Sequence, residues 1–359
     1  MNNKQFDYII FIGRYQPFHD EHAEVLKKAH EYSDKVIVFI GSCNQPRSPK
    51  NPWVFAERKK MIEDYIVDWN YSFPCPSILM DTNLDILPLR DIKYNDQLWA
   101  AQVTDAVDKI ITRDVWKNDH KIRIAIIGHS KDETSYYLKM FPQWKQIEHP
   151  LNENISATTI RKLYFEEMSN KFLKSAVPNN VLKFMDEFPD DIYVKIKNEY
   201  EFIKNYKKGW SVSPYPVKHV TVDALVVQSG HILLVTRKAA PGEGLIALPG
   251  GHLNVNERIV DGMIRELIEE TKLKVPEKVL RGSIKKSEVF DAIDRSQIGR
   301  VITHAFLIEL SPGELPHVKG SDDARKAAWY PISDLNDKLS EEMFFDDHRA
   351  IIDYFLGRG

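Results

Sequence analysis

The chain has 359 residues, of which 43% are hydrophobic and 28% charged, and its formal net charge is −3 at pH 7. This length predicts two domains, and no apolar run approaches the roughly 20 residues that a membrane span needs. The charge gives no basic footprint for nucleic acid, so we expect neither a membrane nor a nucleic acid as partner. The N-terminal residues lack a secretory pattern, and Cys43 and Cys75 have no metal-ligand spacing, which together indicate a cytoplasmic protein with reduced thiols.

The first part of the chain, from Phe6 to about Arg161, alternates short apolar runs with helical stretches. The runs YIIFIG, KVIVFIG and RIAIIG are rich in β-branched residues, and AEVLKKAHEY has helical spacing. This alternation is typical of βαβ units, so we predict an α/β fold with a doubly wound, Rossmann-like parallel sheet.

After Ile160 the pattern becomes helical, until Gly209 and the proline-spaced SVSPYPV end it. Beyond that point TVDALVVQSGHILLVTRK reads as two strands around the turn QSG, and THAFLIEL reads as another strand. We therefore expect an α/β domain with C-terminal helices over residues 1–185, a helical connector and linker over 186–216, and an α+β domain over 217–359.

The stretch FIGRYQPFHDEH holds two histidines, His19 and His22, where an apolar strand ends at Gly13 and a helix follows. Helix positions i and i+3 lie on one face, and the free N–H groups of a helix N-terminus favour a phosphate. A metal site lacks further ligands at obvious spacing. Taken alone, the two histidines also fit an ordinary helix surface, so their neighbours must decide.

Two further motifs stand beside this stretch. GRYQPFHDEH resembles the HxGH nucleotidyltransferase signature of archaeal-type nicotinamide mononucleotide adenylyltransferases, ISATTIR resembles the matching ISxTxxR signature, and GSCNQPRSPKNPWVFAER resembles the GS loop of that family with its Asn-Pro segment. The resemblance implies that His19 and His22, with Arg14 and Arg161, hold the ATP phosphates. One position departs from the signature, because Glu21 replaces its glycine, and a carboxylate there repels a triphosphate unless it turns outward.

Adenylyl transfer needs positive charge and alignment rather than a protein base, because the mononucleotide phosphate attacks the α-phosphorus of ATP and pyrophosphate leaves. We expect Mg²⁺ on the triphosphate. Trp99 is by resemblance a candidate to stack on the nicotinamide ring, and an apolar core position is its alternative. The remaining residues that we expect to bind substrate in this domain are Gly13, Gly41, Ser42, Asn51, Gly128, Ser156 and Thr158, and Ser156 also fits a helix N-cap.

The second domain contains GHLNVNERIVDGMIRELIEETKL, in which Glu266, Glu269 and Glu270 stand at helix positions i, i+3 and i+4. Such spacing predicts three carboxylates on one helix face, where like charges repel unless a hard divalent cation needs them. The wider spacing of Gly251, Glu257, Arg265 and the three glutamates resembles the Nudix box.

Nudix resemblance implies that Glu266, Glu269 and Glu270, together with Gly251, hold Mg²⁺ or Mn²⁺, that Glu269 and Glu270 are catalytic, and that Arg265 orients a carboxylate while binding substrate. Glu257 has a supporting role. Lys272 stands where the family has a glycine that lets the helix end at positive φ, and we expect activity to survive this change. The general base stays open among the acidic residues that we expect in loops, Glu288, Asp291, Glu314, Asp322 and Asp323.

The order of the two domains resembles bifunctional nicotinamide mononucleotide adenylyltransferase/Nudix hydrolases of bacteria. This resemblance implies that the chain makes NAD from ATP and nicotinamide mononucleotide, and hydrolyses ADP-ribose to AMP and ribose 5-phosphate. The alternatives are another phosphate acceptor such as nicotinate mononucleotide or phosphopantetheine, a Nudix domain that acts on a different nucleoside diphosphate derivative or only senses ADP-ribose, and a first domain reduced to a scaffold by Glu21. The sequence leaves the oligomeric state open.

Overall fold

The computed structural model describes residues 4–33, 35–71, 84–114, 122–128, 133–150, 156–167 and 170–358. The chain divides into two compact units, of which unit 1 comprises Met1–Asp91 and Asn95–Ile196, and unit 2 comprises Ile92–Tyr94 and Lys197–Gly359. The division falls within helix α7 (Asp190–Trp210), inside the stretch expected as the connector. The domain boundaries given from the sequence stay predictions.

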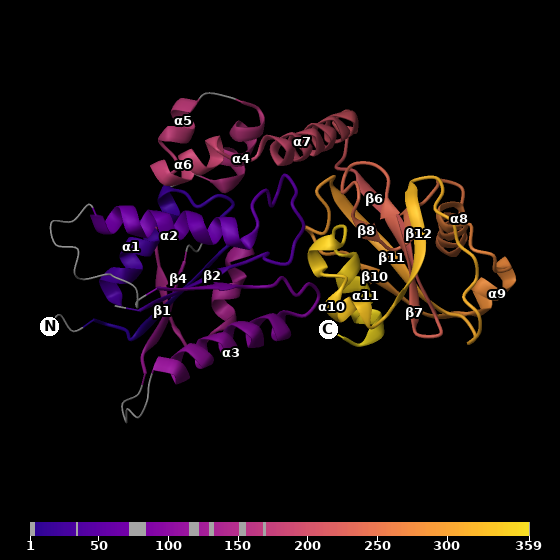
Figure 1. Cartoon of the computed structure of the whole chain (residues 1–359), viewed down its shortest axis with the longest axis horizontal. Helices are drawn as coiled ribbons and strands as arrows, with labels where there is room; N and C mark the ends of the chain where they lie inside the picture. The colour runs from indigo at the N-terminus through magenta and orange to yellow at the C-terminus, as the bar shows by residue number, and fades with distance from the viewer. Residues whose placement is uncertain are drawn as a thin grey trace. The chain divides into compact units, whose positions relative to one another are not determined.

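Unit 1 is built on a five-stranded parallel sheet in the order β3-β2-β1-β4-β5 (Figure 1). Its strands are β1 (Tyr8–Gly13), β2 (Val36–Ile40), β3 (Leu84–Pro88), β4 (Ile124–Gly128) and β5 (Lys145–Glu148). The three central strands are buried almost throughout, as strands covered on both faces must be. The strand order reverses between β1 and β4, so the carboxyl ends of these strands form the crevice where such sheets bind ligands. The predicted doubly wound parallel sheet is confirmed.

Helices of unit 1 cover this sheet, and further helices follow its last strand. On one face, Val103, Val107 and Ile110 of α3 pack against Ile10, Phe39 and Ile126 of the strands. The side-chain amide of Asn180 in α6 donates to the Met61 carbonyl of α2 over 2.8 Å, which ties the later helices to the sheet layer. The helices are α1 (Asp20–Tyr32), α2 (Phe55–Tyr71), α3 (Asp96–Asp114), the 3₁₀ helix η2 (Glu133–Met140), α4 (Ala157–Phe165), α5 (Asn170–Lys174), α6 (Asn179–Asp186) and α7.

Unit 2 contains a seven-stranded mixed sheet, with the path β10-β11-β6-β7-β12 and the short strands β8 and β9 paired to β7 and β6. Strands β6 and β11 pair in parallel and the other pairs are antiparallel. The strands are β6 (Lys218–Gln228), β7 (His231–Arg237), β8 (Ile246–Ala247), β9 (Gly250–His252), β10 (Ile284–Phe290), β11 (Arg300–Glu309) and β12 (Ala324–Pro331). The hairpin expected around QSG is β6-β7, and THAFLIEL lies in β11 except for its last residue, so both strand predictions are confirmed.

The sheet of unit 2 is covered on both faces (Figure 1). Met263, Ile264 and Leu267 of α8 pack on one face, and Ile351 and Ile352 of α11 belong to the cluster on the other. The predicted α+β class is confirmed. The helices are α8 (Ile259–Thr271), α9 (Glu277–Gly282), α10 (Asp334–Asp337), the 3₁₀ helix η3 (Glu341–Met343) and α11 (His348–Leu356).

Two expectations from composition concern the whole chain. Of the described helices, none is long and apolar enough to cross a membrane. Cys43 is a free cysteine, whereas Cys75 lies outside the described residues.

Candidate active sites

The two histidines of the first motif lie at the start of α1. His19 is the N-cap residue, with extended backbone angles, and His22 occupies the third helical position. Their rings stack with centroids 3.6 Å apart and planes 24° apart, and the His19 N–H donates to His22 Nδ1 over 3.3 Å. The expected common face is therefore present, because the i, i+3 spacing brings the imidazoles into contact.

Aromatic side chains from the preceding loop hold His22 in place. The Tyr15 ring meets it edge-on at 4.8 Å, and Phe18 stacks on it at 5.8 Å. Tyr15 has a positive φ of 51° and donates its hydroxyl to the Phe11 carbonyl over 3.2 Å. A Cβ on Gly13 would lie 2.8 Å from the Tyr15 ring, so Gly13 is needed to admit this ring.

Arg161 reaches the same loop from α4. Its Nη1 donates to the Gln16 carbonyl over 2.6 Å and its Nη2 to Thr158 Oγ1 over 3.3 Å. The side chain is 7% exposed, so it supports the loop from beneath, whereas Arg14 is exposed. Burial and the neighbouring Arg14 charge lower the pKa of Arg161 to about 9. The two guanidiniums are therefore close enough for their positive charges to repel. Binding of a polyanion near them would relieve this repulsion.

The other residues expected to bind ATP gather at the carboxyl ends of the strands. The Gly41 N–H donates to the Gly13 carbonyl over 2.8 Å, so the ends of β1 and β2 are joined directly. Ser42 is buried with a φ of 51°. Gly128 ends β4 and is buried, and a Cβ there would meet Leu138 at 3.3 Å.

Two polar residues outside the strand ends complete this group. Ser156 is the N-cap of α4, because its Oγ accepts from the Thr159 N–H over 3.1 Å, as expected. The Asn51 N–H donates to Ser48 Oγ over 3.2 Å, and Asn51 Oδ1 is buried with no hydrogen-bond partner among the residues that the structure describes. A buried amide oxygen with no partner is an acceptor that a ligand donor can satisfy.

The residue expected to stack on a nicotinamide ring, Trp99, lies on α3. It packs against Phe141 and Tyr137, with ring centroids 6.1 and 6.2 Å away, at the edge of the unit 1 core. The structure therefore gives Trp99 a core contact, and its contact with substrate stays a prediction.

In unit 2, Arg265 of α8 is surrounded by carboxylates. Its Nε and Nη2 donate to the two oxygens of Glu257 over 2.9 and 2.7 Å. Its Nη1 lies 2.9 Å from Glu266 Oε1 and 2.9 Å from Glu269 Oε2. Arg265 therefore contacts three carboxylates, and its role in the reaction stays a prediction. Hydrogen bonds from Arg265 are the main reason that the pKa of Glu257 falls to about 2.

The two other glutamates pack against the glycines of β9. A Cβ on Gly251 would lie 2.5 Å from Glu266 Oε1, and the Gly250 N–H donates to Glu270 Oε2 over 3.0 Å. Burial is the largest cause of the raised pKa of Glu266 and of the pKa of about 8 for Glu270. Burial disfavours the charged form of both carboxyls, and a divalent cation would favour it, so the residues present fit such an ion.

The three glutamates share α8 but do not form one cluster. Glu270 is buried against β9, whereas the Glu269 side chain is 43% exposed and is held by Arg265. Within the described ranges, no group of three or more His, Cys, Asp or Glu side chains is arranged to hold a metal. Helical spacing predicts three carboxylates on one face. Hydrogen bonds to different partners, which the spacing does not reveal, hold Glu269 and Glu270 apart.

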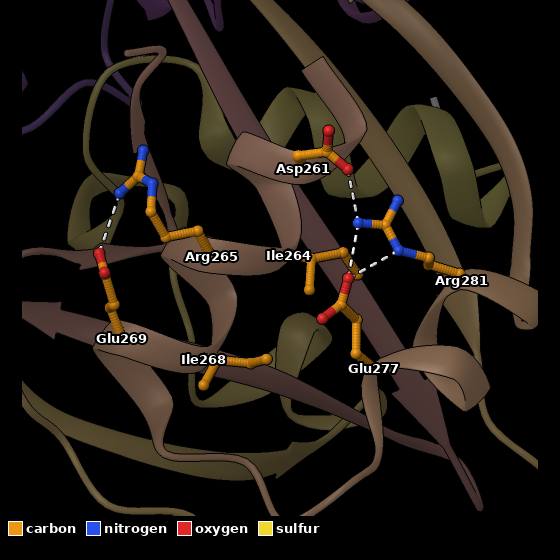
Figure 2. A pocket seen from close by; sticks show the side chains of 7 residues that line it. All are labelled: Asp261, Ile264, Arg265, Ile268, Glu269, Glu277 and Arg281. Carbon is orange, nitrogen blue, oxygen red and sulfur yellow. Dashed lines mark hydrogen bonds and ion pairs between the residues drawn. The ribbon is translucent and has the colours of Figure 1, made fainter. Parts of the chain in front are cut away.

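A groove of about 410 Å³ runs along the outer side of α8 and α9. Figure 2 shows Arg265 directed at Glu269, and Arg281 lying between Asp261 and Glu277. Arg265 and Glu269 therefore line this groove as well as belonging to the Nudix box. The groove is lined by Asp261, Ile264, Arg265, Ile268, Glu269, Glu277 and Arg281.

Two family models match the chain. A Cytidylyltransferase-like model matches residues 10–163 and a NUDIX domain model matches residues 217–355. A nicotinamide/nicotinic acid mononucleotide adenylyltransferase of Acinetobacter baylyi is 37% identical over 199 residues, which are 55% of this chain and 94% of that protein. An ADP-ribose pyrophosphatase of Methanocaldococcus jannaschii is 34% identical over 135 residues, which are 38% of this chain and 72% of that protein.

A solved structure matches the chain along nearly its whole length. It is a bifunctional NMN adenylyltransferase/ADP ribose pyrophosphatase from Francisella tularensis complexed with AMP and a manganese ion. It is 34% identical, with a TM-score of 0.84, and the match covers 98% of this chain and 99% of that one. This chain belongs to that bifunctional family. The family resemblance inferred from the motifs is confirmed. The relatives do not favour phosphopantetheine as acceptor or a different Nudix substrate, whereas the Acinetobacter relative is named for nicotinic acid mononucleotide as well as for the nicotinamide form.

The chain departs from the family motifs at Glu21 and Lys272. Glu21 is 5% exposed, so its side chain is buried rather than turned outward to solvent. Lys272 caps α8 with φ 48° and ψ 33°. The positive φ expected at this family glycine is therefore retained, with a lysine in the left-handed region.

Sequence reasoning placed the acidic base candidates in loops, and the structure corrects one of them. Glu288 lies in strand β10, where it accepts from the Tyr354 hydroxyl over 2.9 Å. Asp291 pairs with Arg300. Asp322 is close enough to Glu266 for its charge to raise the pKa of that glutamate.

Sequence reasoning also missed Arg237 of β7. Its guanidinium lies 4.0 Å from the centre of the Phe345 ring, and its charge lowers the pKa of Glu270. It sits in the run HILLVTRK, which reads only as a strand, and no motif marks it.

Proposed function

We propose that this chain is a bifunctional enzyme of NAD metabolism with one active site in each unit. Unit 1 transfers AMP from ATP to nicotinamide mononucleotide, giving NAD and pyrophosphate, and unit 2 hydrolyses ADP-ribose to AMP and ribose 5-phosphate. The observation that carries the proposal is the full-length match to the Francisella bifunctional enzyme, joined to a separate set of chemically suited residues in each unit.

In unit 1, the stacked imidazoles of His19 and His22 offer N–H donors to the phosphates of ATP, and the exposed guanidinium of Arg14 offers positive charge and donors. Because the attacking phosphate and the leaving pyrophosphate are already suited to their roles, these residues need only align them and stabilise the charge of the transition state. Arg161 acts through the loop carbonyl that it binds, and Ser156, Thr158 and the α4 N-terminus add donors. Mg²⁺ enters with the triphosphate.

In unit 2, Glu266, Glu269 and Glu270, with the main chain of Gly251, would hold Mg²⁺ or Mn²⁺. A cation held there would polarise the diphosphate and lower the pKa of an attacking water. Arg265 keeps Glu257, Glu266 and Glu269 oriented toward one another, and the Gly250 N–H keeps Glu270 in place. These contacts orient the ligands in the way that outer residues support a metal site.

A product assay on the purified protein tests both halves. One mixture contains ATP, nicotinamide mononucleotide and Mg²⁺, and the other contains ADP-ribose with Mg²⁺ or Mn²⁺. The proposal predicts NAD in the first and AMP in the second. AMP without NAD would reject the assignment of unit 1, and NAD without AMP would reject that of unit 2.

A second acceptor belongs in the same assay. The Acinetobacter relative is named for nicotinamide and nicotinic acid mononucleotide alike. Nicotinate mononucleotide in place of the nicotinamide form therefore measures the acceptor preference of unit 1 directly, through the ratio of the two kcat/KM values.

A further inference from the structure

Arg58 of α2 is one of the largest fully buried side chains, with 1% exposure. Its Nη1 donates to the carbonyls of Arg14 and Gly41 over 2.7 and 2.6 Å, and its Nη2 donates to the Ser42 carbonyl over 3.3 Å. Its Nε donates to Val54 O over 3.4 Å, one helical turn back. In the described part of the chain, the hydrogen bonds of this guanidinium all go to main-chain carbonyls rather than to a carboxylate.

These carbonyls belong to two loops that leave the sheet side by side. Arg14 follows β1, and Gly41 and Ser42 follow β2, and the two strands are parallel neighbours. One planar, rigid guanidinium therefore fixes the loop after β1, which leads to His19 and is called the histidine loop, to the loop Gly41–Asn44 after β2, called the GS loop. A flexible side chain with fewer donors could not join the two loops equally well. The side chain of Arg14 stays exposed while its carbonyl is held.

Asp91 holds the GS loop from the opposite side. Its Oδ1 accepts from the Ser42 N–H over 3.1 Å, so the N–H of Ser42 is fixed by Asp91 and its carbonyl by Arg58. The main chain of Asp91 also exchanges hydrogen bonds with the Asn44 side-chain amide, over 2.9 and 3.2 Å. Ser42 has a φ of 51°, a left-handed conformation that costs a non-glycine residue of order 1 kcal/mol and persists only where the surroundings enforce it.

We infer that Arg58 and Asp91 are positioning residues for adenylyl transfer, which together hold the loop Gly41–Asn44 and the backbone of Arg14 in the arrangement that receives the ATP triphosphate. This inference rests on the proposed function of unit 1. Arg58 cannot touch the nucleotide, because it is buried under the loops, so it acts through the peptide groups that it binds.

The charge of Arg58 adds to the same effect. Burial, the largest cause, and the Arg14 charge are the effects that lower its pKa, which is about 10, so the group stays protonated at neutral pH. With Arg161, whose pKa also falls because of Arg14, three guanidiniums lie within electrostatic reach around the histidine loop. Such a concentration of like charge is unfavourable in the free protein and becomes favourable when a polyanion binds.

The test uses the full-length protein and measures ATP affinity by calorimetry, without the mononucleotide, beside the steady-state constants for NAD synthesis. Arg58→Met keeps an extended side chain but removes the charge and the N–H donors. Arg58→Lys keeps the positive charge but lacks the planar set of guanidinium donors. We expect Kd for Mg-ATP to rise about tenfold in Arg58→Met and less in Arg58→Lys. We expect kcat to fall in both, with KM for the mononucleotide within twofold of the original value. The number of ATP sites per molecule in the calorimetric titration reports the fraction of folded unit 1, and ADP-ribose hydrolysis in the same samples reports folded unit 2.

Asp91 supplies a second, independent pair of variants in case Arg58→Met does not fold. Asp91→Ala removes the acceptor for the Ser42 N–H, and Asp91→Asn keeps one. The inference predicts a weaker ATP affinity in Asp91→Ala and near-complete recovery in Asp91→Asn. Arg113→Met is the matched control, because Arg113 is an exposed arginine of unit 1 that pairs with Asp85.

Unchanged ATP affinity and kcat in folded Arg58→Met, or in Asp91→Ala, would overturn the inference. An equal loss of both activities, with ATP affinity per folded molecule unchanged, would also overturn it in favour of a role in stability alone. The original protein is assayed alongside, so absence of NAD there would reject the proposed function of unit 1 instead.

Discussion

The imidazole rings of His19 and His22 stack with centroids 3.6 Å apart at the first turn of α1. Two rings so close together can bind the same phosphate through their N–H groups. Their positions are set by the helix N-cap and by the rings of Tyr15 and Phe18 that pack on His22.

His22→Ala tests this pair of donors. We expect kcat for NAD synthesis to fall by roughly 10²-fold, the usual effect of removing one preorganised donor to a developing charge. ADP-ribose hydrolysis should stay within twofold, because it belongs to unit 2. Lys28→Ala, which removes an exposed residue of the same helix, serves as the control. A rate of NAD synthesis unchanged by His22→Ala would show that the stacked pair does not serve the transfer.

Arg265→Lys tests the carboxylate arrangement of the Nudix box. A lysine cannot reproduce a fork that contacts three glutamates, so hydrolysis should fall by roughly 10- to 100-fold and half-maximal rate should need more Mg²⁺ or Mn²⁺. The measurement is the hydrolysis rate as a function of metal concentration. Arg281→Lys is matched to it, because Arg281 lines the same groove but pairs with Asp261 and Glu277 (Figure 2). Similar effects of the two variants would contradict the account.

Much of this arrangement can be read from the sequence, and the reasons differ between elements. The continuous apolar runs of β1, β2 and β4 predict a parallel sheet, because strands that are covered on both faces need apolar side chains on both faces. Motif spacing places His19, His22 and the Nudix glutamates on their helices, since that depends on local geometry alone.

Contacts between distant segments are the part that the sequence does not reveal. Arg161 binds the Gln16 carbonyl across 145 positions of the chain, so a residue predicted to face phosphate is found beneath the loop. Glu269 and Glu270 are adjacent in sequence, yet Arg265 holds one and the Gly250 N–H holds the other. Glu288 reads as a loop acid because its strand pattern is interrupted by charged neighbours, KKSE.

Lys272→Gly tests the departure at the end of α8. The lysine has a φ of 48°, which glycine adopts without steric cost, and glycine loses more backbone entropy on folding. The two effects leave a gain of about 0.5 kcal/mol in the free energy of unfolding, to be measured by urea denaturation followed through a unit 2 signal. Lys274→Gly, at an exposed position outside the residues of positive φ, should give no gain. Destabilisation by Lys272→Gly would contradict this explanation.

Glu270 makes the stability of the metal-free protein depend on pH. Burial raises its pKa to about 8, above the value of 4.5 for the free side chain, so between these values the folded state binds a proton that the unfolded state has lost. The free energy of unfolding must then fall as the pH rises from about 5 to 8. Denaturant titrations in a chelator should show this fall, and Glu270→Gln should reduce it. An equal slope in Glu270→Gln would assign the effect to other groups.

Metal addition should reverse the pH effect. Because a metal ligand must be deprotonated, binding of Mg²⁺ or Mn²⁺ below pH 8 releases a proton from Glu270. Calorimetric titration with either ion in two buffers of different ionisation heat measures the number of protons released, and Glu270→Gln should lower that number.

The central claim is that one chain carries two independent active sites, and a crossed product assay tests it most directly. NAD synthesis and ADP-ribose hydrolysis are measured on His19→Ala and on Glu269→Gln, each beside the original protein. The account predicts that His19→Ala loses NAD synthesis by orders of magnitude and keeps hydrolysis, and that Glu269→Gln does the reverse. Loss of both activities in either variant, or hydrolysis unchanged in Glu269→Gln, would contradict it.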